Sequence, residues 1–145
     1  MVMRRLVVLL AGLWGGLLIG VGLIGAPAAF AVATAEVAGR SAGRMFAAEA
    51  YVSLTLALLL LMALRRSISR HAGGEATAVF NTNALLVLGA LFCTVAGYFG
   101  LQPLMAAARV GQGSLSFGAL HGLTAGLFAL KTLLVLLFAW RLGAV

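Results

Sequence analysis

The stretch Leu6–Phe30, LVVLLAGLWGGLLIGVGLIGAPAAF, contains no charged residue and decides the fold class. A helix of about 20 apolar residues is long enough to cross a hydrocarbon core about 30 Å thick. Only helices and closed barrels satisfy their backbone polar groups in lipid, and the stretch lacks the alternating pattern of a barrel strand. It therefore predicts a transmembrane helix.

The composition of the whole chain supports the same conclusion. Of 145 residues, 63% are hydrophobic and 9% are charged, against roughly 45–50% and about 25% in soluble domains. We expect a single membrane domain over residues 1–145, with the all-α fold of an integral membrane four-helix bundle. The four predicted spans cover about 6–30, 46–64, 84–101 and 117–140.

Basic residues give the chain a net charge of +7, but no run of them is dense enough to follow a nucleic acid backbone. We expect the lipid bilayer, not nucleic acid, as the partner. Counting Lys and Arg by alternate connections predicts the orientation, because cytoplasmic loops carry the excess. One side has Arg4, Arg5, Arg65, Arg66, Arg70 and Arg141, and the other has Arg40, Arg44 and Arg109. Six against three predicts that both termini are cytoplasmic.

The N-terminus also imitates a signal peptide, with MVMRR before the apolar run and ATA before Glu36. A signal peptide usually has an apolar region of about 7–15 residues, and this run is longer. We expect an uncleaved first span. A chain that started at Glu36 would have a different topology.

Glycines recur at intervals of four in the first and fourth predicted spans. Residues four apart share a helix face, so each set forms a groove that a second helix can approach closely. The grooves either pack within the bundle or bind another copy or a partner membrane protein. The two sets are Gly12, Gly16 and Gly20, and Gly118, Gly122 and Gly126.

Charged residues of the first connection suggest a polar group at one membrane surface. Glu36 and Arg40 are four apart in the favourable order for a helical pair. Glu49 is expected within the headgroup region or just inside it, where an unpaired carboxylate is costly. Its nearest expected partners are Arg44 and Arg109. The group is either an interfacial salt-bridge network or a mouth that binds anions or handles protons.

The last predicted span carries an ionisable residue near mid-bilayer, Lys131. At 3.6 residues per turn, His121, Thr124, Phe128 and Lys131 share one face. A lysine facing lipid at this depth costs about 2.5–3.5 kcal/mol. Either Lys131 extends to the cytoplasmic surface while His121 caps polar groups at the outer one, or both face a shared interior site.

Residues suited to catalysis are scarce in the predicted spans. The chain has no aspartate, and Glu36, Glu49 and Glu75 are expected at or beyond the membrane edges. His121 is the one histidine within a span, since His71 falls on the opposite side, and Cys93 is the single cysteine. We expect no enzyme, no metal site and no cofactor.

Several short motifs in a fixed order carry a family resemblance over nearly the whole chain. They are GLWGG at Gly12–Gly16, AP at Ala26–Pro27, AGR followed by Phe46, QP followed by Arg109, and Phe117 with Leu120, His121 and Thr124. In these motifs the chain resembles the transmembrane protein 205-like family, which in bacteria is domain of unknown function 4149. The resemblance implies a four-helix protein of the bacterial inner membrane and no reaction. A polar position typical of the family is Phe128 here.

These observations leave two function classes open. The first is a bundle that binds or transports a small molecule or an ion. Its candidate site residues are His121, Thr124, Arg109 and Glu49, with Lys131 at the floor and Arg44 and Arg40 at the mouth. The second is a structural or assembly subunit that packs against partner helices through its glycine grooves.

Overall fold

The computed structural model describes the backbone of residues 2–71 and 82–143, and the side chains of 3–66 and 82–143. Glu75 and the side chains of Arg70 and His71 lie outside these residues. The first span consists of α1 (Val2–Ile19), η1 (Gly20–Gly25) and α2 (Ala26–Val32). The second is α3 (Ala35–His71), the third is α4 (Thr82–Thr94), η2 (Val95–Gly100) and α5 (Leu101–Arg109), and the fourth is α6 (Phe117–Gly143).

Four helical stretches are long and apolar enough to cross a membrane, which confirms the predicted all-α membrane bundle. They cover Met3–Val32, Ala35–Arg66, Thr82–Arg109 and Phe117–Gly143. Each predicted span lies inside one of them. The described residues contain helices and turns and no strand.

The helices extend further than the sequence predicted, into segments expected to be connections. Only Ala33 and Thr34 separate α2 from α3. The first turns of α3 are rich in alanine, and Glu36 and Arg40 form an exposed ion pair of 2.5 Å across one turn. At the other connection the helix continues through Pro103 to Arg109, and the π turn η2 ends three residues before that proline.

Two of the spans contain a π-helical turn, a local widening that often marks functional sites. In η1 the Ala26 N–H donates to the Val21 carbonyl, five residues earlier. This π turn lies directly before Pro27 in the second position of α2. In η2 the Leu101 N–H donates to the Ala96 carbonyl in the same way.

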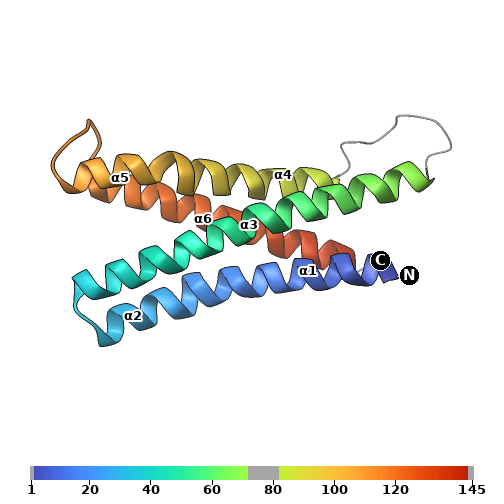
Figure 1. The fold of residues 1–145 in the computed structure, drawn as a ribbon, viewed down its shortest axis with the longest axis horizontal. Coiled ribbons are helices and arrows are strands. Elements are labelled where there is room, and N and C mark those ends of the chain that lie inside the picture. The colour runs from blue at the N-terminus through green and yellow to red at the C-terminus, as the bar shows by residue number, and fades with distance from the viewer. Residues whose placement is uncertain (1, 72–81, 144–145) are drawn as a thin grey trace.

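The bundle has one closely packed half and one half in which the helices diverge (Figure 1). Near the termini, α6 packs against α1 and α4, and α3 packs against α4 and α1. At the opposite end α2 stays with α3 and α5 stays with α6, and α2 makes no close backbone approach to α5 or α6. The core cluster includes Val7, Ala11, Trp14, Leu18, Ala57, Leu60, Leu86, Val87, Ala90, Val135 and Phe138.

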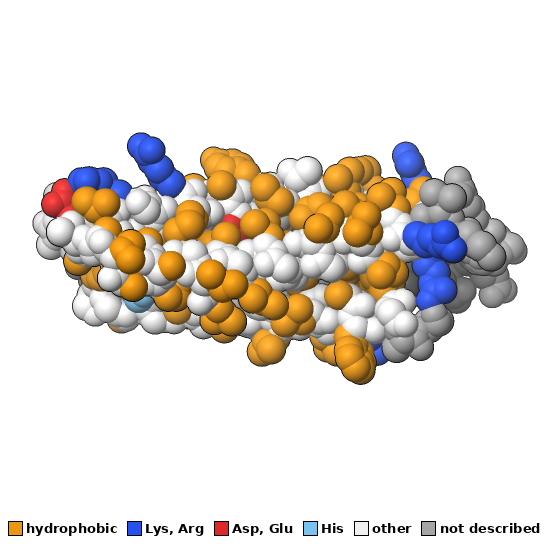
Figure 2. Space-filling view, turned by 90° about the horizontal axis from the view of Figure 1, so that it is seen from below, with side chains coloured by type: hydrophobic (Ala, Val, Ile, Leu, Met, Phe, Trp, Pro, Cys, Tyr) orange, Lys and Arg blue, Asp and Glu red, His pale blue; other side chains and the backbone are white. Residues whose placement is uncertain are grey.

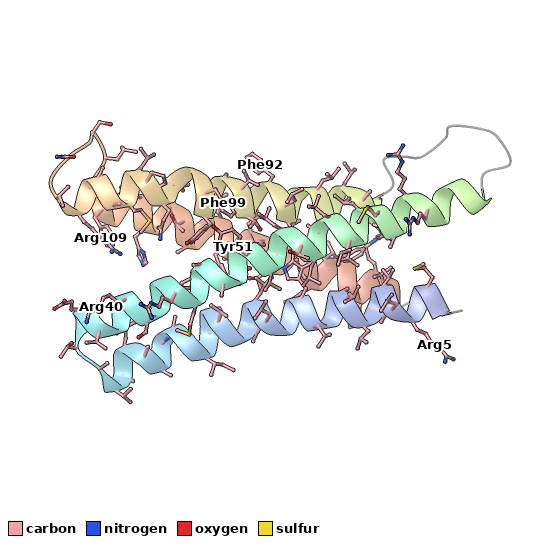
Figure 3. All side chains as sticks on the ribbon, viewed as in Figure 1. Arg5, Arg40, Tyr51, Phe92, Phe99 and Arg109 are labelled. Carbon is pink, nitrogen blue, oxygen red and sulfur yellow. The ribbon has the colours of Figure 1, made fainter. Side chains whose placement is uncertain are left out.

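Basic side chains gather at the two ends of the molecule, and apolar side chains cover the length between them (Figure 2). Arg5 lies at the end that holds the termini, and Arg40 and Arg109 lie at the opposite end, as Figure 3 shows. Near the termini, the Arg4 guanidinium donates to the Leu142 carbonyl and Arg141 donates to the Asn83 side chain. We call the opposite end, which carries Arg40, Arg44 and Arg109, the arginine end. Which end faces the cytoplasm stays a prediction.

The six glycines at intervals of four do not pack within this bundle. A Cβ atom built on any of them would meet no neighbouring atom within 4 Å. The expectation of tight packing inside the bundle is therefore wrong for these positions, because the inward faces of α1 and α6 are the opposite ones. The glycines lie on outward faces. The six are Gly12, Gly16, Gly20, Gly118, Gly122 and Gly126.

Candidate functional site

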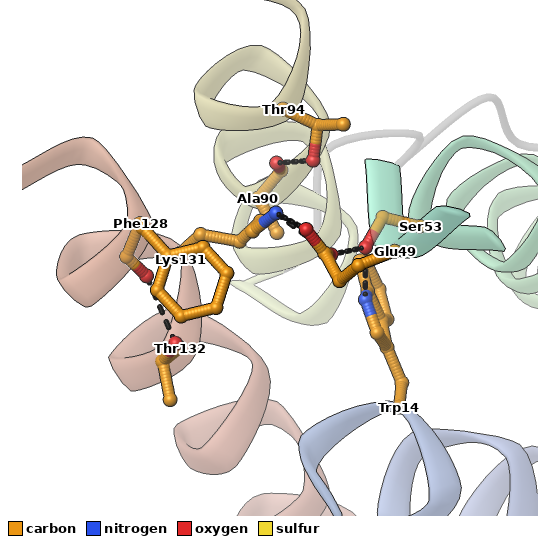
Figure 4. A network of polar contacts seen from close by, with 8 residues as sticks. All are labelled: Trp14, Glu49, Ser53, Ala90, Thr94, Phe128, Lys131 and Thr132. Carbon is orange, nitrogen blue, oxygen red and sulfur yellow. Dashed lines mark hydrogen bonds and ion pairs between the residues drawn. The ribbon is translucent and has the colours of Figure 1, made fainter. Parts of the chain in front are cut away.

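A buried ion pair lies between α3 and α6. The Lys131 Nζ donates to both Oε1 and Oε2 of Glu49, at 2.8 Å each. Lys131 and Glu49 are each 3% exposed. They are the only acidic and basic side chains that are buried among the described residues, and they bind each other (Figure 4).

Hydrogen bonds extend the ion pair to a third helix. The Ser53 hydroxyl donates to Glu49 Oε1, and the Trp14 Nε1–H donates to Ser53 Oγ at 2.8 Å. Ser53 and Trp14 are both fully buried. The chain Trp14–Ser53–Glu49–Lys131 thus connects α1, α3 and α6 (Figure 4). No buried side-chain nitrogen or oxygen in the described part of the protein lacks a partner.

The ion pair lies at the middle of the membrane-spanning length. Lys131 is 14 residues after Phe117 and 12 before Gly143, which is about 21 Å and 18 Å along the helix at 1.5 Å per residue. Glu49 is 14 residues after the start of α3 at Ala35. Both charges therefore lie about 18 Å or more along their helices from the nearest helix end.

Helical spacing in both helices explains the arrangement. Glu49 and Ser53 are four residues apart on α3, so they share the face that continues with Ala57 and Leu60. On α6 the buried positions Lys131, Val135 and Phe138 repeat at four and three. Each helix therefore presents its polar group on the stripe that faces the other.

An ion pair at this depth has a high energetic cost, which makes its presence informative. Removing two charges from water costs several kcal/mol per ion, and mutual attraction with hydrogen bonds offsets this only when the geometry is good. Apolar residues of similar volume often stabilise a fold as well or better. Ionisable groups inside a membrane accordingly mark functional sites by default.

Two aromatic rings cover the ion pair on the side of the arginine end. The Phe128 ring, one turn before Lys131, lies with its centroid 4.9 Å from Nζ. Phe46, one turn before Glu49, meets Phe128 edge to face at 5.2 Å between centroids. Gly22 of η1 makes room for the Phe128 ring, since a Cβ there would lie 2.5 Å from Cε1.

Buried groups of α4 complete the surroundings of the ion pair. Thr94 is buried, but its hydroxyl donates to the Ala90 carbonyl of its own helix at 3.0 Å. Cys93, the neighbouring residue, is a buried free thiol. Among the described residues, the buried titratable side chains are therefore Glu49, Lys131 and Cys93.

The structure brings together only some of the predicted site residues. Thr124 faces inward, and its hydroxyl donates to the Leu120 carbonyl at 2.9 Å and lies 3.4 Å from the Met105 sulfur. His121 is exposed and stacks on Phe117 at 5.9 Å between centroids. His121 and Lys131 therefore share no interior site.

The arginines at the arginine end stay away from Glu49. Arg40 pairs with Glu36, and the Arg109 guanidinium lies 5.0 Å from the centroid of the Phe117 ring. Arg44 is exposed and makes no ion pair within the described residues. The predicted pairing of Glu49 with Arg44 or Arg109 is wrong, because α3 begins earlier than expected and carries Glu49 deeper. Extension of Lys131 to the cytoplasmic surface, one of the two alternatives, is also wrong, because its partner Glu49 lies at the same depth.

Ser53 and Trp14 are site residues that sequence reasoning missed. The spacing of Glu49 and Ser53 by four was a usable signal, since it places a hydroxyl one turn from a carboxylate on one helix face. Nothing in the sequence pointed to Trp14, because its indole N–H reaches the site across an interface between helices.

Fold and site together define a polytopic membrane protein with a buried, hydrogen-bonded ion pair at its centre. Residues 9–114 match the family model described as Domain of unknown function (DUF4149). The match covers most of the chain, which therefore belongs to this family. The matched range includes Trp14, Glu49 and Ser53 and ends before Phe117, so it contains neither His121 nor Lys131. The wider resemblance to the transmembrane protein 205-like family stays a prediction.

No curated protein and no solved structure matches the chain significantly. The family carries no established reaction in its description.

Proposed function

We propose that this protein binds or transports a small molecule or an ion at the Glu49–Lys131 pair, in the inner membrane of a bacterium. The observation that carries the proposal is the depth of the pair: both charges are buried at mid-span and bind each other. A bundle that only had to fold could replace them with apolar residues of similar volume. Catalysis is not part of the proposal, since every buried polar side chain in the described part of the protein already has a hydrogen-bond partner.

The shape of the bundle supports entry from the arginine end. The core cluster closes the half near the termini, whereas α2 and α5 diverge at the opposite end (Figure 1). From that direction the Phe128 ring lies against Lys131, and the Phe46 ring packs on Phe128. With the predicted orientation, this entry faces the outside of the cell.

Native mass spectrometry of the protein, released from membranes in mild detergent, tests the proposal. We expect the unchanged protein to retain a small molecule, and the double variant Glu49→Gln, Lys131→Met to lose it. The double variant removes both charges together and so leaves no unpaired buried ion. Thr94→Val is the matched control, because Thr94 is buried nearby but hydrogen-bonds only to its own helix. A double variant that retains the same molecule would refute the proposed site.

The outward glycine stripes favour a second candidate, an assembly subunit. Gly118, Gly122 and Gly126 leave open space beside α6, as the first set does beside α1. Small residues of this kind allow close approach of another membrane helix. In the same measurement this candidate predicts a second protein chain in place of a small molecule, and its loss in Gly122→Leu.

A further inference from the structure

We infer that the ligand of this site is a monocarboxylate with an apolar body, which enters together with one proton and replaces Glu49 on Lys131. The inference rests on the proposed function and names its ligand class. It is carried by the charges around the site, by the hydrogen bonds of Glu49, and by the apolar cover above the pair.

The charges of the arginine end favour an anion over a cation. Among the described side chains there, Glu36 is neutralised by Arg40, while Arg44 and Arg109 meet no carboxylate. The buried pair itself is neutral. An approaching cation would therefore meet excess positive charge, and an anion would be attracted.

Lys131 already holds a carboxylate in the geometry that a ligand would need. Its Nζ contacts both oxygens of Glu49 at 2.8 Å. A monocarboxylate offers the same two acceptors to the same donor. Glu49 of α3 thus occupies the position on Lys131 that the ligand carboxylate would take.

Replacement of Glu49 by an anionic ligand keeps the net buried charge at zero only when a proton accompanies the anion. Otherwise the Glu49 carboxylate would remain buried without a cation, which is strongly unfavourable. With one proton added, Glu49 becomes a neutral carboxylic acid and the ligand carboxylate pairs with Lys131, so the buried charge stays zero. The acid still accepts from Ser53 through its carbonyl oxygen and donates its O–H to the ligand.

No other buried group of the described residues can take this proton at the pair. Ser53 and Trp14 are already hydrogen-bonded to each other, and α1 contributes no buried titratable side chain. Cys93 of α4 is the remaining buried titratable group, and a neutral thiol carries no negative charge that an added proton could neutralise. Glu49 is therefore the proton acceptor.

The apolar body of the ligand follows from the route to the pair. At mid-span the rings of Phe46 and Phe128 lie directly above the charges. The inward positions of α6 nearer the arginine end include buried Leu120, and the α5 residue beside them is buried Met105. These side chains suit an alkyl chain and offer little to a polar body.

Fluorescence of Trp14 can report arrival of such a ligand, because three successive hydrogen bonds, through Ser53 and Glu49, connect its indole to Lys131. The chain has two tryptophans, and Trp140 is 77% exposed. In a Trp140→Phe background, Trp14 becomes the single reporter. The probe is 2-bromostearate, whose bromine lies beside the carboxylate and therefore on the side of the ligand nearest Trp14, where it quenches tryptophan at short range. Its methyl ester is the uncharged control.

We expect saturable quenching of Trp14 by 2-bromostearate and none by the ester. Between pH 6 and 8 the apparent affinity should fall about tenfold per pH unit, because binding takes up one proton. Glu49→Gln should keep quenching and lose its pH dependence, and Lys131→Arg should keep both. Glu49→Gln, Lys131→Met should abolish saturable quenching in a protein that still folds.

Two results would overturn the inference. Equal quenching by the acid and the ester would show partition of the probe into lipid near the helix. Absence of quenching by either, in a protein that retains another small molecule at Lys131 by mass spectrometry, would keep the proposed function and refute the ligand class.

Discussion

The Glu49–Lys131 pair has unequal consequences for single and double substitution. Lys131→Met leaves a buried carboxylate without its cation, and such losses cost about 3–5 kcal/mol. Adding Glu49→Gln removes that penalty. We therefore expect a large fall in thermal unfolding temperature in detergent for Lys131→Met and recovery of most of it in the double variant. Equal destabilisation in both variants would show that the packing of the methylene chain of Lys131, and not its charge, stabilises the bundle.

Sequence reasoning identified Lys131 as the residue to explain and left two destinations open, the cytoplasmic surface and an interior site shared with His121; the structure places it inside without His121. The spacing showed that a lysine occurs at mid-span, and it placed Phe128 on the same face. It could not show the partner, which is 82 residues away in the chain. The polar segment before Glu49 predicts a connection, and with it a position for Glu49 at the membrane edge, whereas α3 already begins at Ala35. Pairing across helices depends on rotation and depth, which one sequence does not specify.

The π-helical element η1 is where a glycine is required by close approach. Gly22→Ala places a methyl group 2.5 Å from the Phe128 ring, so the ring or the helix must shift. Overpacking of this kind costs about 1–3 kcal/mol. Gly16→Ala is the matched control, since its new methyl group meets nothing within 4 Å. We expect a lower unfolding temperature for Gly22→Ala only, and restoration by Phe128→Leu.

Elements as a whole were predicted better than their ends. The apolar segments gave four spans at the right places, because length and composition suffice for a helix in lipid. The segments after Ala35 and Leu101 were predicted as connections on account of their charges and Pro103. The alanine-rich segment and the Glu36–Arg40 pair support helix in the first of these segments, and the second follows the π turn η2 and stays helical through Pro103.

The whole molecule has two chemically different ends, which makes its orientation testable. By sequence, the end that holds the termini carries six arginines, and the opposite end, named above for Arg40, Arg44 and Arg109, carries three. The positive-inside bias therefore predicts that the end with the termini faces the cytoplasm. In a Cys93→Ala background, Ser114→Cys should react with an impermeant maleimide in intact spheroplasts. Thr82→Cys, at the other end, should react only after lysis.

The reverse labelling pattern would place both termini outside. It would also move the diverging helices, and with them the proposed entry to the ion pair, to the cytoplasmic side. The chemistry proposed at Lys131 would be unaffected, because the pair lies midway between the surfaces.

The 82 residues between Glu49 and Lys131 have a consequence for biosynthesis. At about 5–20 residues per second, the ribosome needs about 4–16 s to make the second charge after the first. During that interval the newly inserted second span holds a carboxyl group whose cation has not yet been synthesised. Membrane insertion of this protein therefore has a waiting period, in which Glu49 must be protonated, screened by water, or sheltered by the insertion machinery until α6 arrives.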